Sequence, residues 1–395
     1  MTPVPPSASK AAVAARSAAG SLTAFCPWAG EEGVRVYLRP VGLMPIAAWA
    51  KGAAVPLAGG RFAFATAELI VRQIDRPQGA DRIERAFAPL AEIMAWGWER
   101  SRAVAERLDR QLGALTRARP AFAGLDLARP RLMGIVNVTP DSFSDGGDFL
   151  DPAAAIAHGQ ALVEAGADIL DVGGESTRPG AAPVPAEVEE ARVLPVIRHF
   201  AERGVTVSVD TRHARVMAAA IGAGARIVND VAGLADPLAL PVVAKSGTPV
   251  VLMHMQGEPG TMQSDPHYRD AALDVFDWLE ARVERCTAAG VPLDRITVDP
   301  GIGFGKTVAH NVAILRHTTL YHALGCPLLI ALSRKSFIGA LSRGEPPRAR
   351  LAGSLAAGLD SLNQGAQMLR VHDVADSVQA RAVWEALHPP ADVVR

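Results

Sequence analysis

The sequence is poor in several features that mark particular classes of protein. Only three cysteines occur among 395 residues, Cys26, Cys286 and Cys326, and no two of them form a CxxC pair. An odd number of widely spaced cysteines argues against a disulfide framework and against a structural zinc site. The formal net charge is −1, so the charge balance indicates neither a nucleic-acid nor a membrane-surface partner. No apolar run approaches the roughly 20 residues that a transmembrane helix needs.

The first 30 residues are rich in Ala and Ser and contain no acidic residue before Glu31. A transit peptide can have this composition, but the stretch lacks the apolar core of a secretory signal. Apolar residues make up 49% of the chain and charged residues 21%, which is ordinary for a soluble globular protein. We therefore expect a cytoplasmic protein. Its 395 residues exceed the usual size of one hydrophobic core, which favours one large domain and a smaller one.

Residues 126–395 alternate between short apolar runs rich in Val and Ile and stretches of helical period, and the alternation repeats eight times. Each run is nearly continuous in its apolar character, as expected of a parallel strand buried on both faces. Eight such units predict a (β/α)8 TIM barrel. A doubly wound sheet is the alternative, but regular units without a break favour closure. The predicted strands begin at Arg131, Asp168, Thr206, Arg226, Pro249, Ile296, Pro327 and Gln367.

Residues 1–125 are expected to form a smaller α+β amino-terminal subdomain of unknown role, whose first 30 or so residues need not be ordered. Short strands are predicted around Gly-Gly turns, and one or two helices from about Asp81 to Arg117. The region contains no P-loop, HExxH motif or cluster of metal ligands. We expect it to serve in dimerisation or in docking of a partner, so that removing residues 1–120 leaves catalysis measurable.

Polar residues gather at or just after the ends of at least seven of the predicted strands. In a barrel these positions converge on the face where active sites are built. A single Asp is more often a helix cap or a loop hydrogen-bonder, but agreement among so many strand ends predicts a functional site. The set comprises Asn137, Asp141, Asp145, Glu175, Thr177, Arg178, Asp210, Asn229, Asp230, Asp299, Arg334, Lys335, Ser336, Arg370, His372 and Asp373.

The loops after the first two predicted strands, NVTPDSFSDGGDF and GGESTRPGAAPVP, are too long for tight βα turns and are typical of mobile lids. A third segment, DPGIGFGKT from Asp299 to Thr307, looks like a phosphate-binding P-loop. Pro300 stands where that motif requires a glycine, so we reject the interpretation that this segment is the P-loop of an ATPase.

Taken together, the motifs resemble the signatures of the dihydropteroate synthase family, in its order. They are NVTPDSFSDGG, GESTRPGA, SVDTR, NDVAG, LMHMQGEPGTMQ, DPGIGFGKT, SRKSFIG and RVHDV, and the resemblance covers about residues 131–387. It implies a transferase of folate synthesis with small-molecule substrates. The reaction joins (7,8-dihydropterin-6-yl)methyl diphosphate to p-aminobenzoate and gives 7,8-dihydropteroate and diphosphate. It also implies magnesium as cofactor, a homodimer, and competition by sulfonamides at the p-aminobenzoate site.

The resemblance assigns roles to individual residues. Asp145, Lys335, Arg370 and His372 match catalytic residues, and diphosphate is expected to leave before the amine attacks. The pterin is expected to be held by Asp210, Asn229, Asp299, Lys335 and Arg370. The diphosphate is expected at Asn137, Arg370 and His372, with Asn137 also contacting the metal. The p-aminobenzoate slot is matched by Phe143, Thr177, Arg178, Pro179, Phe304 and Ser336.

Two alternatives remain at this point. A methyltetrahydrofolate-binding methyltransferase shares the barrel and the pterin pocket, but it needs neither a diphosphate site nor a p-aminobenzoate slot. A non-catalytic homologue that binds pterin, or acts as a scaffold, is expected to lose its loop motifs, and both loops are intact here.

Overall fold

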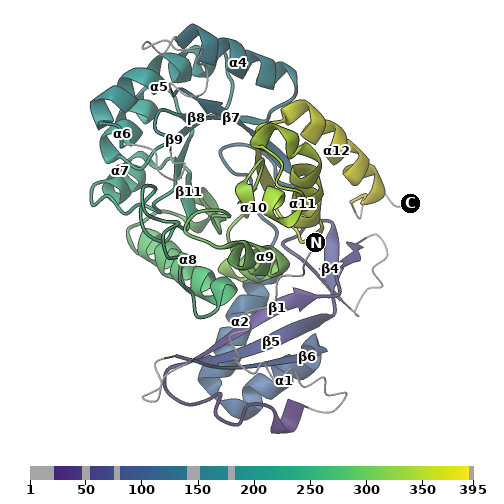
Figure 1. The fold of residues 1–395 in the computed structure, drawn as a ribbon. Coiled ribbons are helices and arrows are strands. Elements are labelled where there is room, and N and C mark those ends of the chain that lie inside the picture. Colours follow the sequence, from purple (N-terminus) through teal and green to yellow (C-terminus); the bar gives the residue numbers. More distant parts are fainter. Residues whose placement is uncertain (1–21, 47–53, 75–80, 140–151, 177–182, 391–395) are drawn as a thin grey trace.

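The computed structural model describes residues 22–46, 54–74, 81–139, 152–176 and 183–390. It consists of a barrel surrounded by helices and a smaller amino-terminal part that lies against one side of it, near α8 and α9 (Figure 1). Among the described residues, no helix combines the length and the hydrophobicity that crossing a bilayer requires.

The barrel has eight parallel strands, in the order β12-β11-β10-β9-β8-β7-β14-β13. An isolated parallel bridge between Val298 and Leu328 joins β12 to the segment leading into β13 and closes the ring. All eight predicted strands are confirmed, and each begins within two residues of its predicted start. They are β7 (Arg131–Asn137), β8 (Ile169–Gly173), β9 (Val207–Asp210), β10 (Ile227–Asp230), β11 (Val250–Met253), β12 (Ile296–Asp299), β13 (Leu329–Ala331) and β14 (Met368–Val371).

Helices follow the strands and form the outer ring of the barrel (Figure 1). Their inner faces are apolar and pack on strands whose residues are almost all buried, which explains the continuous apolar runs of the sequence. The helices are α4 (Pro152–Glu164), α5 (Ala186–Ala201), α6 (Ala214–Gly222), α7 (Ala239–Ser246), α8 (Ala271–Ala288), α9 (Val308–Arg316), α10 (Ser336–Leu341), α11 (Leu351–Asn363) and α12 (Val374–Leu387).

A short turn ahead of the first barrel strand packs into the end of the barrel opposite the polar strand ends. The backbones of Phe122 and Leu125 exchange two hydrogen bonds, of 3.0 and 2.9 Å. Phe122 is fully buried in a separate apolar cluster with Met133, Ile169, Ile227, Val251 and Met368, at or near the first residues of their strands. These residues fill the amino-terminal end of the barrel.

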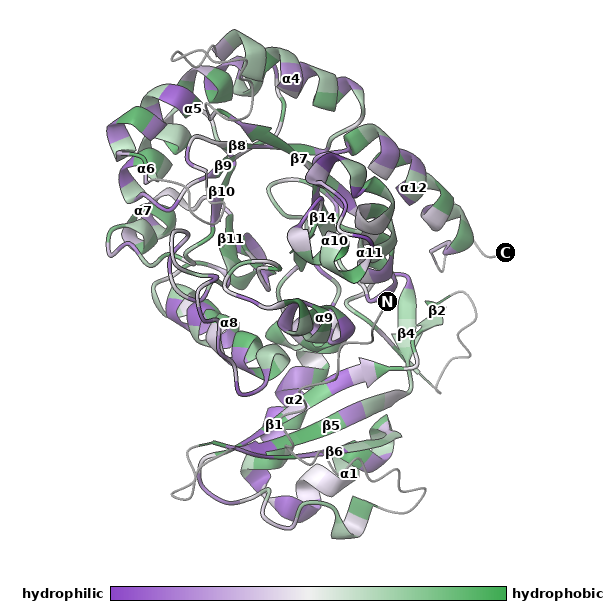
Figure 2. Ribbon diagram, viewed as in Figure 1, coloured by the Kyte–Doolittle hydropathy of each residue, from purple (hydrophilic) through white to green (hydrophobic). Residues whose placement is uncertain are grey.

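The amino-terminal part is built on a three-stranded antiparallel sheet, in the order β1-β5-β6. Hydrophobic residues form the middle of β5, hydrophilic residues form its carboxyl-terminal end (Figure 2), and all but its first and last residues are buried. One face of the sheet lies on α1 and α2, and Tyr37 on the other face packs edge-to-face on Phe276 of α8 with ring centres 5.6 Å apart. The elements are β1 (Val34–Val41), β5 (Thr66–Gln73), β6 (Arg82–Pro89), α1 (Leu90–Arg100) and α2 (Arg102–Thr116), with a small sheet of β2 (Met44–Pro45), β4 (Phe62–Phe64) and β3 (Val55–Pro56).

One sequence-based expectation for this region was wrong. The helix expected from Asp81 begins only at Leu90, because residues 82–89 pair along their whole length with β5 as strand β6. Sheet pairing here overrides the helical propensity of Glu, Arg and Ala. Residues 22–30 pack against this part of the fold: Cys26 is 1% exposed, and the indole of Trp28 donates a hydrogen bond to Glu84 at 3.1 Å.

Candidate active site

The described strand ends bring the predicted pterin-binding residues together at the carboxyl-terminal face of the barrel. Asp210 and Asp299 are the last residues of β9 and β12, and Asn229 lies one residue before the end of β10. Arg370 lies near the end of β14, and Lys335 follows β13 directly before α10. Parallel pairing sets Asn229 beside Asp210, so neighbouring strands present their polar groups at one level.

Arg370 joins two carboxylates across this face. Its Nε donates to Oδ2 of Asp171 at 2.5 Å, and its Nη2 donates to Oδ2 of Asp210 at 2.6 Å. The side-chain amide of Asn229 donates to the same oxygen of Asp171 at 2.9 Å. The planar guanidinium is therefore held at two points, which fixes its orientation.

Burial shifts the pKa values of the ionisable groups in this site. It raises the pKa of Asp210, although the neighbouring Arg370 opposes the shift. Burial likewise raises the pKa of Asp299, while the Lys335 ammonium opposes it. For Lys335, burial lowers the pKa to about 8, with Asp299 acting in the other direction. The site thus holds several ionisable groups away from their ordinary values, as catalytic and binding sites often do.

Lys335 connects the pterin side of the site to the β12–α9 loop. Its Nζ donates to the backbone carbonyl of Ile302 and lies 4.6 Å from the ring centre of Phe304. The structure therefore brings Phe304, predicted for the p-aminobenzoate slot, next to Lys335. Ser336 is the first residue of α10, and its side chain is exposed beside them.

The residues predicted for the diphosphate lie on neighbouring strands. Asn137 is the last residue of β7, which pairs with β14. His372 directly follows β14, and its Nδ1 lies 3.1 Å from Oγ of Ser333. The remaining predicted site residues, Phe143, Asp145, Thr177, Arg178 and Pro179, lie outside the described residues.

Asp171 is a site residue that the sequence reasoning missed. It lies inside β8 and is fully buried, and its Oδ1 has no hydrogen-bond partner among the described residues. The signal was present in the sequence, because an acidic residue in the middle of the apolar run ILDVG must have a partner when it is buried. That partner is Arg370, 199 positions away.

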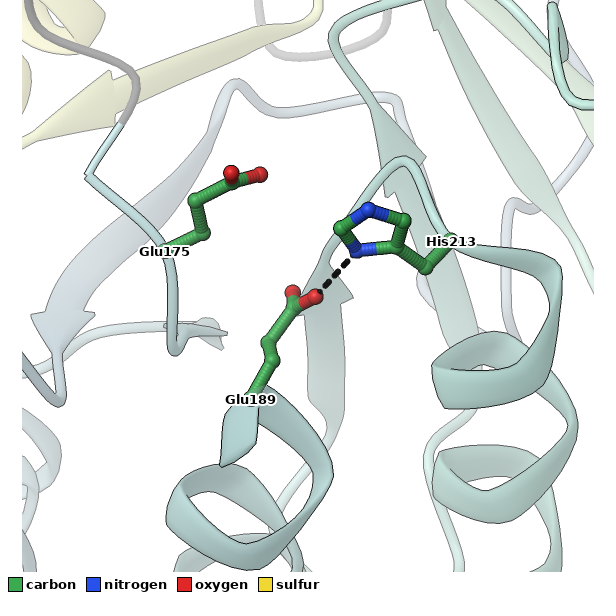
Figure 3. Close-up of side chains that lie close together, drawn as sticks. All are labelled: Glu175, Glu189 and His213. Carbon is green, nitrogen blue, oxygen red and sulfur yellow. Dashed lines mark hydrogen bonds and ion pairs between the residues drawn. The ribbon is translucent and has the colours of Figure 1, made fainter. Parts of the chain in front are cut away.

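Glu175, Glu189 and His213 form a second polar cluster, after β8 and at the starts of α5 and α6 (Figure 3). Their ligand atoms lie within 4.8 Å of one another, and Nδ1 of His213 lies 2.6 Å from Oε2 of Glu189. The guanidinium of Arg212, however, binds both oxygens of Glu175, at 2.9 and 3.0 Å. A cation is already present at Glu175, so we assign no metal ion to the cluster.

The rejection of a P-loop agrees with the contacts of Lys306. Its Nζ donates to the carbonyl oxygens of Phe304 at 2.9 Å and His254 at 3.2 Å, and it lies 2.9 Å from Nδ1 of His254. Burial holds the pKa of this amine well below its usual value, although the Asp299 carboxylate opposes the shift. Lys306 therefore supports the loop from inside and is not directed at a ligand.

Known proteins resemble this chain in sequence and in fold. The model of the family described as "Pterin binding enzyme" matches residues 133–372. The dihydropteroate synthase of Escherichia coli K12 is 47% identical over 263 residues, which are 66% of this chain and 93% of that protein. Among solved structures, the dihydropteroate synthase of Xanthomonas albilineans with 4-aminobenzoic acid is 50% identical, with a TM-score of 0.64 over 68% of this chain and 97% of that one. The same enzyme in complex with 7,8-dihydropteroate gives 48% identity and a TM-score of 0.62, covering 67% of this chain and 96% of that one.

A closed parallel barrel with this set of strand-end residues defines a pterin-binding enzyme. The chain belongs to the dihydropteroate synthase family.

Proposed function

We propose that this chain condenses (7,8-dihydropterin-6-yl)methyl diphosphate with p-aminobenzoate to give 7,8-dihydropteroate and diphosphate. The observation that carries the proposal is the convergence of Asp210, Asn229, Asp299, Lys335 and Arg370 at one end of the barrel, in a chain of this family. The similar proteins from Escherichia coli and Xanthomonas albilineans are dihydropteroate synthases, which favours this reaction over the methyltransferase and non-catalytic alternatives.

The pterin ring carries both donors and acceptors, and the pocket offers complements for both. The carboxylates of Asp210 and Asp299 and the amide of Asn229 would accept from the ring's amino and N–H groups, while the Lys335 ammonium would donate to its carbonyl. An ill-fitting ring would leave such buried groups unpaired, at a cost of about 1–3 kcal/mol each. The Arg370 guanidinium, oriented by its two carboxylates, would lie against the ring face.

The diphosphate end is assigned to Asn137, Arg370 and His372, with magnesium as the family's cofactor. The Asn137 side chain makes no hydrogen bond to another described residue, so its amide oxygen is available as a hard donor. One such ligand suits magnesium, which is commonly held by few protein groups together with phosphate oxygens and water. When bound, the ion would spread the negative charge of the departing diphosphate.

In the proposed order of events, the bond between the methylene carbon and the diphosphate oxygen breaks first, and its electron pair leaves with the diphosphate. The methylene cation is stabilised by conjugation with the dihydropterin and by the carboxylates around it. The amine nitrogen of p-aminobenzoate then forms the new C–N bond and loses a proton. Asp145 is proposed to act in the closed site, where exclusion of water protects the cation from hydrolysis.

Phe304, Lys335 and Ser336 form the described part of the proposed p-aminobenzoate slot. The aromatic ring of Phe304 and the aliphatic stem of Lys335 suit a flat benzene ring, and the exposed Ser336 hydroxyl suits the carboxylate. Phe143, Thr177, Arg178 and Pro179 are proposed to complete the slot.

We further propose a cytoplasmic homodimer that associates through barrel helices. Val383 and Leu387 lie one turn apart on α12 and are 58% and 70% exposed, which is unusual for large apolar side chains. Light scattering would show a monomer if this part of the proposal is wrong.

The decisive assay mixes the purified protein with the pterin diphosphate, p-aminobenzoate and magnesium, and follows diphosphate and dihydropteroate together. Matched appearance of both products, with competition by a sulfonamide against p-aminobenzoate, is the expected result. Diphosphate without dihydropteroate would mean that water or another acceptor takes the cation. Neither product, from a folded protein that binds the pterin, would favour the non-catalytic alternative.

A further inference from the structure

Two acidic residues at the start of α8 each bind the helix and the amino-terminal sheet at the same time. Oδ1 of Asp270 caps the helix by accepting from two backbone amides at 3.1 Å, while its Oδ2 accepts from Arg85 of β6 at 2.7 Å. Oδ2 of Asp274 accepts from the backbone amide of Arg269 at 2.8 Å, while its Oδ1 accepts from Arg72 of β5 at 2.5 Å. The position of the helix start is therefore tied to the sheet.

The ion pair between Arg72 and Asp81 is shielded from water on both sides, since each side chain is 3% exposed. Nε of Arg72 donates to Asp81 at 2.6 Å. Asp81 in turn accepts from Arg269 at 2.7 Å, so the residue before Asp270 is held as well. Pairs this buried are far less screened than surface ion pairs, and breaking one leaves an unpaired charge.

The residues that lead into α8 lie directly on the β12–α9 loop. The hydroxyl of Tyr268 donates to the backbone carbonyl of Gly305 at 2.7 Å. Its ring packs edge-on against His310, with ring centres 4.8 Å apart. The side chain of Gln256 binds both backbone groups of His267, at 2.7 and 2.8 Å. Tyr268 and Asp270 are two positions apart, so a shift of the helix start must move this contact.

The loop has no room to absorb such a shift. Gly305 has a φ of +60°, and a Cβ there would lie 2.3 Å from the carbonyl oxygen of Gln256. Phe304 directly precedes Gly305, and its ring lies 4.6 Å from the Lys335 ammonium. The close backbone packing thus transmits a displacement at Tyr268 to Phe304.

We propose that the amino-terminal sheet is a positioning element of the active site. Through Arg72 and Arg85 it holds the start of α8, and through Tyr268 and Gly305 it sets the position of Phe304 on the p-aminobenzoate side. This inference rests on the proposed function. Asp210, Asn229 and Arg370 lie on β9, β10 and β14, away from this series of contacts, so binding of the pterin diphosphate is affected less than binding of the amine.

The test compares KM values for the two substrates in Arg85→Met and Tyr268→Phe with those of the intact chain. Arg85→Met removes the link to Asp270, together with a contact to Glu68 at 3.2 Å, and Tyr268→Phe removes the link to Gly305; each change keeps most of the side chain's volume. Loss of one such hydrogen bond is expected to raise KM for p-aminobenzoate about three- to tenfold, with KM for the pterin diphosphate nearly unchanged. Arg85→Lys, which keeps the charge, should restore most of the lost affinity.

Arg107→Met is the matched control. Arg107 lies on α2 and pairs with Glu280 at 2.8 Å, so it also joins the amino-terminal part to α8, but near the middle of the helix. This variant should leave KM for p-aminobenzoate unchanged. If it raises KM as much as Arg85→Met does, the sheet contributes only general stability and the proposal is wrong.

A double variant tests whether Arg85 and Tyr268 act through the same contacts. If they do, KM for p-aminobenzoate in Arg85→Met/Tyr268→Phe rises less than the product of the two single effects. If the KM of the double variant instead rises by the full product of the two single effects, the proposed connection is wrong, even if Arg85→Met also lowers the unfolding temperature. An intact chain that makes no dihydropteroate would refute the proposed function instead, so the two failures are distinguishable.

Discussion

Arg370 is hydrogen-bonded to Asp210 at 2.6 Å, so two residues assigned to the pterin are also paired with each other. Each side chain is held in position by the other at the carboxyl-terminal end of the barrel. Pre-arranged polar groups bind with less loss of conformational freedom than groups that must be ordered by the ligand.

Asp210→Asn is expected to weaken binding of the pterin diphosphate about ten- to hundredfold, the effect of a mismatched buried polar group. The new amide presents a donor where the ring also donates, and it removes one of the two carboxylates that orient Arg370. Fluorescence titration with the pterin diphosphate measures the change. Asp376→Asn, an exposed change on α12, is the control. Equal affinity in the two variants would mean that Asp210 does not bind the pterin.

Arg370→Met tests the energetics of the buried pairs. Loss of the cation leaves the buried Asp171 and Asp210 without the positive charge that pairs with both, which is expected to lower the free energy of unfolding by about 3–5 kcal/mol. Adding Asp171→Asn to this variant should restore part of the lost stability, because a neutral amide costs less to bury than an unpaired carboxylate. Urea unfolding of both variants measures the difference. Equal stability of the single and the double variant would contradict this account.

The sequence predicted the barrel strands better than the contacts between the barrel and the amino-terminal sheet. Strands buried on both faces leave a strong signal, a continuous apolar run that ends in a polar residue such as Asp210 or Asp299, and all eight were found. Asp171 was missed because it lies within a run and not at its end. The contact between Arg72 and Asp274 could not be predicted, because the two residues are 202 positions apart and Asp274 looks like an ordinary helix-surface charge.

Alkaline pH should weaken pterin binding through Lys335. Burial lowers the pKa of its ammonium to about 8, so the proton that would donate to the pterin carbonyl is present below that pH and lost above it. We expect kcat/KM for the pterin diphosphate to fall about tenfold for each pH unit above pH 8. Lys335→Arg keeps its charge at every pH tested and should lack this decline, whatever its activity at neutral pH. A profile that stays flat to pH 9.5 in the unaltered chain would show that the Lys335 proton is not required.

Phe122→Ala separates stability from catalysis. Phe122 fills the end of the barrel opposite the active site and is fully buried, so its removal leaves a cavity among Met133, Ile169 and their neighbours. The free energy of unfolding is expected to fall by about 3–5 kcal/mol, while Phe122→Leu should cost much less because it fills most of the space. Since the strand ends that carry the site lie at the other end of the barrel, KM for both substrates should stay unchanged in the folded variant. Urea unfolding and steady-state kinetics measure the two quantities on the same preparation. A large change in either KM, with little loss of stability, would mean that this turn acts on the site and not only on the core.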